Sequence, residues 1–230
     1  MSGNRIESGI EATPPKSETR EGWTSRLLPL VLPGILGSLF VLLQRVGAVA
    51  QLQSETSVVV LALICFIGAA VLYLTFLYQR ESLLERLASV MTSVGFGLNL
   101  AAWGTRWLIV GHSPLSNLYD TSLFFAMATA AASLVITSVY RHRFLGVLTM
   151  PVSMLLLILG LLFGNEARDL PPVLVSYWRP IHVSIAMAGY AVCATSFATA
   201  LLYLLKDKVK LELIAIFAML VAVLTYGLVS

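Results

Sequence analysis

Two short segments of this 230-residue chain concentrate the side chains that could bind a ligand. Residues 111–120 read GHSPLSNLYD and bring a histidine, an asparagine, a tyrosine and an aspartate together between two long apolar runs. Residues 177–184 read YWRPIHVS, so that His182 follows Trp178 and Arg179 at short spacing. An imidazole can ligate a metal, an indole offers a flat aromatic surface, and a guanidinium binds carboxylates. These two segments are therefore the candidate functional sites.

His182 is the strongest candidate for a metal ligand. Pro180 favours the start of a helix just before it, and the positive end of a helix dipole disfavours imidazolium, which leaves a neutral ring nitrogen available. The set fits haem, with His182 as axial iron ligand, Trp178 packing on the ring and Arg179 contacting a propionate. The alternative is interfacial anchoring, because Trp and Tyr gather at membrane boundaries without any ligand and Arg there can meet a lipid phosphate.

Residues 111–120 are more typical of a structured loop than of a metal site. Pro114 favours a turn, Asn117 can bond its own backbone, and Asp120 stands where the next helix needs a carboxylate to cap its free amides. We therefore expect Asn117, Tyr119 and Asp120 to shape the loop and not to contact iron.

Three further residues belong to this loop region. His112 could ligate a metal or form a surface hydrogen bond, and we favour the hydrogen bond. Arg106 and Trp107 precede the loop at the end of an apolar run, where we expect them to snorkel or to stack against the membrane interface.

The elements that position these residues are membrane helices. The chain is 58% hydrophobic and 12% charged, with a mean hydropathy of +0.86, which indicates an integral membrane protein. We expect an all-α bundle in which residues 1–26 form a disordered cytoplasmic tail and residues 27–230 form the transmembrane domain. Seven segments are long and apolar enough to span: about 27–48, 56–79, 87–110, 121–140, 144–164, 181–205 and 211–229.

Charge bias orients these spans. Of the 15 Lys and Arg residues, 11 fall on one side of the predicted bundle and 4 on the other. The positive-inside rule then places the N-terminus in the cytoplasm, the C-terminus outside, and both candidate segments on the exoplasmic face. The scattered basic residues do not indicate nucleic-acid binding, and the chain has no P-loop, zinc-protease or nucleophile-elbow motif.

Both segments resemble the CcsA/ResC family of cytochrome c biogenesis proteins. Arg106-Trp107 followed by 111–120 is similar to the family's Arg-Trp…Gly-His-x-Pro-Leu-Ser-Asn-Leu-Tyr-Glu stretch, with Asp120 in place of Glu. Residues 178–191 resemble its Trp-x-x-x-His-Val-Ser…Gly-Tyr-Ala stretch, and the resemblance covers about residues 57–230. It implies that His182 is the first of two external histidines that hold haem b transiently beneath a tryptophan-rich platform, the WWD motif. It also implies a CcsB/ResB-like membrane partner and apocytochrome c, whose CxxCH thiols add to the haem. The location that it implies is a bacterial cytoplasmic membrane or a thylakoid membrane.

The chain departs from the family pattern after these motifs. No Trp follows Trp178, no His follows His182, and Ser230 falls about where the resemblance places the platform. If the haem site is built like that of the family, half of it is present, and we expect this chain by itself to be non-catalytic and to hold haem weakly. Three interpretations stay open: a truncated or split CcsA-like protein completed by another chain that carries the WWD segment, a non-catalytic structural subunit or scaffold of a membrane complex, and a small-molecule transporter.

Overall fold

The protein is a bundle of long apolar helices. The computed structural model describes residues 23–48, 54–140, 145–164, 175–206 and 219, and within these ranges all regular structure is α-helical. The helices are α1 (Trp23–Val46), α2 (Thr56–Gln79), α3 (Ser82–Val110), α4 (Leu118–Tyr140), α5 (Gly146–Phe163) and α6 (Trp178–Lys206). All six are long and apolar enough to cross a membrane, which confirms an all-α membrane bundle. The predicted seventh span, 211–229, lies outside the described residues except for Met219.

The observed helix boundaries agree closely with the predicted spans where a helix begins with apolar residues, and less closely where it begins with polar residues. Helix α2 has the predicted bounds, whereas α3 begins at Ser82, before the predicted start at residue 87. Helix α3 begins with Ser82, Glu85 and Arg86 around two leucines, and these polar residues lower the apolar content of the window although the backbone is already helical. For the same reason α1 begins at Trp23, within the segment predicted as a tail, and α6 begins at Trp178.

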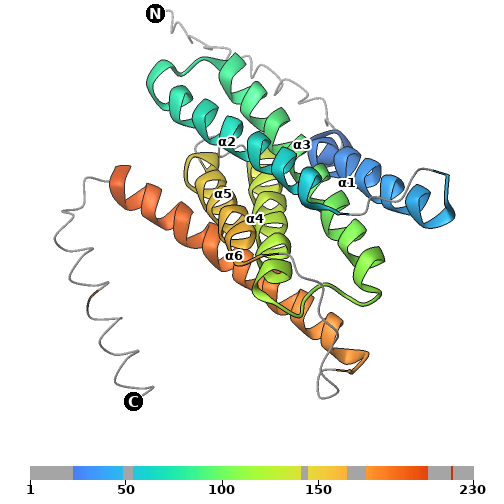
Figure 1. The fold of residues 1–230 in the computed structure, drawn as a ribbon. Helices are drawn as coiled ribbons and strands as arrows, with labels where there is room; N and C mark the ends of the chain where they lie inside the picture. The colour runs from blue at the N-terminus through green and yellow to red at the C-terminus, as the bar shows by residue number, and fades with distance from the viewer. Residues whose placement is uncertain (1–22, 49–53, 141–144, 165–174, 207–218, 220–230) are drawn as a thin grey trace, which may run out of the picture.

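Four helices form the centre of the bundle. Helix α2 packs on α3 and α5, and α4 packs on α3 and α5, so that these four close a ring around the core. Helix α1 lies on the outside against α3 and α4, and α6 runs diagonally along α4 and also contacts α5 (Figure 1). The core cluster lies inside the ring and includes Phe66, Tyr73, Tyr119, Leu123 and Met150.

Short polar side chains link the central helices. Asn99 on α3 donates its Nδ2 hydrogen to the carbonyl of Leu123 on α4 at 3.2 Å. The hydroxyls of Ser133 on α4 and Thr149 on α5 are 2.8 Å apart. Such hydrogen bonds between membrane helices satisfy groups that lipid could not, and they fix the helices in register.

Helices α1 and α3 cross at a pair of glycines. A Cβ atom on Gly37 would lie 2.6 Å from the carbonyl oxygen of Gly97, closer than real Cβ contacts allow. The absence of side chains at this crossing lets the two backbones touch, which is how small residues hold membrane helices together.

We predict that Gly37→Ala displaces α1 from α3 and lowers stability by about 1–3 kcal/mol, the usual range for overpacking. Gly34→Ala on the same helix is the matched control, because its Cβ would meet only the Phe96 ring at an ordinary 3.5 Å. The free energy of unfolding of both variants is measured in detergent. Equal stability of the two would show that the backbone contact does not hold α1 in place.

Candidate functional site

The loop that joins α3 to α4 starts at a helix end where glycine is favoured. Gly111 has φ 72°, the left-handed region, and its N–H donates to the carbonyl of Trp107 at 3.0 Å. A residue with a Cβ is strained in this conformation, so glycine is favoured as the helix terminator. The chain then turns through residues 112–117 and enters α4 at Leu118.

Asn117 caps the start of α4. Its Oδ1 accepts the backbone N–H of Asp120 at 2.7 Å, and its carbonyl accepts the Thr121 hydroxyl at 2.9 Å. The sequence predicted Asp120 as the capping carboxylate, and this detail was wrong because an asparagine three residues earlier reaches the free amide first. The Asp120 carboxylate is instead available for other contacts.

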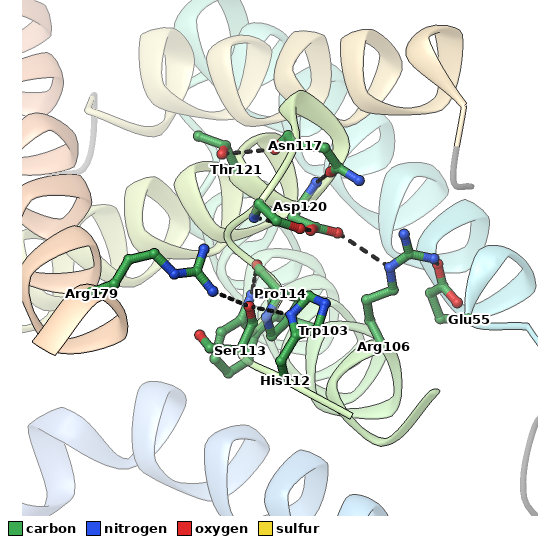
Figure 2. Close-up of polar contacts among 11 residues, drawn as sticks. Glu55, Trp103, Arg106, His112, Ser113, Pro114, Asn117, Asp120, Thr121 and Arg179 are labelled. Carbon is green, nitrogen blue, oxygen red and sulfur yellow. Dashed lines mark hydrogen bonds and ion pairs between the residues drawn. The ribbon is translucent and has the colours of Figure 1, made fainter. Parts of the chain in front are cut away.

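Asp120 belongs to a buried charge cluster with Glu55 and Arg106 (Figure 2). The Arg106 Nε lies 3.2 Å from Asp120 Oδ1, and its Nη1 lies 3.2 Å from Glu55 Oε1. The exposed fractions are 2% for Arg106 and 1% for each carboxylate residue. The prediction that Arg106 snorkels or stacks at the interface was therefore wrong: two carboxylates neutralise it and allow it to be buried.

The cluster ties together several segments that are distant in sequence. Glu55 precedes α2, Arg106 lies near the end of α3, and Asp120 lies in the first turn of α4. The second Asp120 oxygen, Oδ2, accepts the backbone N–H of Ser116 at 3.2 Å and the Ser116 hydroxyl at 2.9 Å. The Arg106 guanidinium also lies over the Tyr119 ring, 5.1 Å from its centroid. One buried arginine thus orients the loop and the adjoining ends of these helices.

Aromatic packing supports the same loop. Trp103 Nε1 donates to the Pro114 carbonyl at 3.3 Å, and the Trp103 ring packs against Phe124 on α4. Trp107 meets Trp103 edge-to-face, with ring centroids 5.2 Å apart, and is 43% exposed. The position of Trp107 at the rim is compatible with the predicted interfacial contact.

Arg179 joins the second candidate segment to this loop. Its Nη1 donates to the Leu115 carbonyl at 3.2 Å, and its Nη2 donates to the Ser113 carbonyl at 3.4 Å. Figure 2 shows Arg179 reaching the loop from the side opposite Arg106. Two segments that lie about 60 residues apart in sequence are therefore in direct contact, and the first turn of α6 is fastened to the loop.

The other predicted haem contacts lie beside Arg179 on α6. Trp178 and His182 are four residues apart, so they share one face of the helix. Trp178 is 58% exposed, the His182 side chain is also exposed, and within the described part of the chain no residue hydrogen-bonds to the His182 ring. By contrast, His112 places its Nδ1 3.1 Å from the Ser113 carbonyl, so its ring takes part in the loop.

Glu55 is the site residue that sequence reasoning missed. It is a single acidic residue directly before an apolar span, and nothing in its neighbourhood marks it as special. The alternating direction of the spans could have predicted its location. If consecutive spans cross in opposite directions, the residues before α2, at the end of α3 and at the start of α4 lie on the same side of the membrane. That rule alone puts Glu55 on the same side as Arg106 and Asp120.

Comparisons with known proteins identify relatives of this chain. A family model described as Cytochrome C assembly protein matches residues 115–228, which begin within the α3–α4 loop. The chain is 32% identical to the cytochrome c biogenesis protein CcsA of Porphyra purpurea over 135 residues, which are 56% of this chain and 41% of that protein. It is 34% identical to CcsA of Gloeothece citriformis over 112 residues, 47% of this chain and 34% of the relative. It is 31% identical to CcsA of Microcystis aeruginosa over 150 residues, 64% and 46% respectively.

The chain belongs to the CcsA family of cytochrome c biogenesis proteins. Its matched part spans between about a third and a half of the length of these curated relatives. No solved structure matches it.

The buried charge cluster predicts an unequal response to neutralising its members. Arg106→Gln leaves two carboxylates buried without a counter-ion, and we expect a loss of about 3–5 kcal/mol of stability. Glu55→Gln leaves the Arg106–Asp120 pair intact and removes the excess negative charge, so its cost should be at most about 1 kcal/mol. Thermal unfolding in detergent measures both, and a Glu55→Gln variant as unstable as Arg106→Gln would contradict this charge balance.

Proposed function

We propose that this chain handles haem in c-type cytochrome maturation at the outer face of the membrane, as part of a CcsA-like protein. The family supports a role in cytochrome c biogenesis, since the relatives carry that name. Haem is the substrate that must be carried and presented in that process. The α3–α4 loop and the start of α6, where both candidate segments meet, form the proposed working end of the bundle.

The exposed face of α6 carries this proposal. His182 and Trp178 are both exposed on the same helical face, and the helix is anchored at Arg179, one residue after Trp178 and three before His182. An exposed imidazole next to an exposed indole, on a fixed backbone, suits a large flat ligand that approaches from outside. We assign His182 as an axial ligand of the haem iron and Trp178 as a packing surface for the ring.

Arg179 has a more limited part in haem contact than its residue type suggests. Two of its nitrogens already donate to loop carbonyls, and its buried Nε has no hydrogen-bond partner among the described residues. The Nε–H and the second hydrogens of Nη1 and Nη2 are still available to a propionate, but the two loop contacts fix the direction in which the guanidinium points. We therefore propose that Arg179 chiefly positions the first turn of α6, and that propionate contact is secondary.

A complete haem site needs components beyond these residues. These residues supply one imidazole, so a second histidine of the kind that the family resemblance implies would come from another segment or another chain. We propose that a chain carrying a tryptophan-rich WWD segment completes the site, together with a CcsB/ResB-like membrane partner, and that apocytochrome c receives the haem. Before that assembly, haem b should bind this chain weakly and exchange readily.

The test is a haem titration of the purified chain in nanodiscs, followed by absorption spectroscopy. We expect His182→Ala to lose the imidazole-ligated spectrum, whereas His112→Ala keeps it because that ring is engaged with the loop. Empty nanodiscs correct for haem that partitions into lipid.

A spectrum that survives His182→Ala unchanged would refute the assignment. Absence of haem binding together with stable association to another membrane complex would favour the scaffold interpretation, and substrate flux in vesicles would favour a transporter.

Arg179→Gln tests the positioning role separately. Losing the contacts with the Ser113 and Leu115 carbonyls should free the start of α6 and weaken haem binding about tenfold, the equivalent of one charged hydrogen bond. The spectrum of the haem that still binds should keep its imidazole signature, because His182 is intact. Loss of that signature would mean that Arg179 contributes directly to the iron environment, contrary to a positioning role.

A further inference from the structure

An apolar groove separates the C-terminal parts of α1 and α3. Its volume is about 360 Å³, and we call it the α1–α3 groove. Both of its walls come from α1 and α3, so the groove includes none of the α6 residues assigned to haem. The residues that form it include Val41, Leu42, Arg45, Leu100, Trp103 and Trp107.

The groove is built into the crossing of the two helices. Gly104 allows Val41 to approach so closely that a Cβ on that glycine would lie 2.6 Å from a Val41 methyl group. The indoles of Trp103 and Trp107, which meet edge-to-face, make one wall rigid. An apolar cleft between spanning helices is filled by lipid in a bilayer unless protein covers it.

Arg45 stands at the end of this groove and differs from Arg106 in its surroundings. It is exposed in the last turn of α1, one residue before the helix ends at Val46. No described residue forms an ion pair with it, whereas two carboxylates neutralise Arg106. At the end of a spanning helix a guanidinium lies at headgroup level, where lipid phosphates are available.

Trp107 adds a second polar atom near the same level. It lies in the last turn of α3, is 43% exposed, and its indole N–H has no hydrogen-bond partner among the described residues. Its neighbour Trp103, in contrast, donates to Pro114. The groove therefore combines an apolar interior with a positive charge and an available donor at one end.

We propose that the α1–α3 groove binds an anionic phospholipid, with an acyl chain along the apolar wall and the phosphate at Arg45. Arginine binds phosphate oxygens through two parallel N–H donors, and the Trp107 N–H can supply a third. This inference does not rest on the proposed haem function.

Two other occupants fit the groove less well. Haem would need an axial ligand, and the residues that line the groove include no His, Cys or Met. An apolar partner helix would cover Arg45 without neutralising it, which is costly in a membrane. A phospholipid with a net negative charge can place an acyl chain on the apolar wall and its phosphate at the Arg45 guanidinium.

Native mass spectrometry of the full chain provides the test. The protein is reconstituted in nanodiscs with equal amounts of phosphatidylglycerol and phosphatidylcholine, and the lipid retained after release is identified. We expect wild type to retain one phosphatidylglycerol at least tenfold over phosphatidylcholine, and Arg45→Gln to lose this preference. Trp107→Phe keeps the aromatic wall but removes the N–H, so it should weaken retention several-fold.

Arg86→Gln is the matched control. Arg86 is also exposed, and it lies at the opposite end of α3 from the groove. It should therefore leave retention unchanged. Equal retention of the two lipids by wild type, undiminished retention in Arg45→Gln, or displacement of the lipid by added haem would each overturn the proposal.

Discussion

The pairing of Arg106 with Asp120 and Glu55 is the interaction on which the arrangement of this end of the bundle depends. A guanidinium that is 2% exposed in a membrane protein must have counter-ions, and its two partners come from segments on either side of α3. Once Arg106 is held, the start of α2 and the start of α4 are fixed with it. The α3–α4 loop follows, because Asp120 also binds Ser116.

That fixed loop serves as the docking surface for α6. The carbonyls of Ser113 and Leu115 receive the Arg179 guanidinium, and His182 lies within one helical turn of this contact. The buried charge cluster therefore holds the α3–α4 loop in place, and the loop holds the helix that carries the exposed His182 imidazole. A residue that is to meet a large ligand must be accessible, and an accessible residue stays in place only if something buried holds its backbone.

Most of the fold was predictable from sequence because a membrane demands long apolar helices. The six described helices coincide with predicted spans, and the misplaced starts of α3 and α6 fall where polar residues extend a helix past the apolar window. The site was predictable only in part. Motif resemblance identified residues 111–120 and His182, but it gave no indication that Arg106 is buried or that Glu55 is its partner, because both facts depend on contacts between helices far apart in sequence. The contact of Arg179 with the loop is of the same kind.

We propose that His182 ligates haem iron from a helix that the α3–α4 loop anchors. Chemical rescue provides the test: His182→Gly is loaded with haem with and without free imidazole, and haem that remains with the protein after gel filtration is measured by its absorption spectrum. We expect the glycine variant to lose haem and free imidazole to restore an imidazole-ligated spectrum to the protein fraction. Haem retention by His182→Gly equal to wild type without imidazole would contradict it.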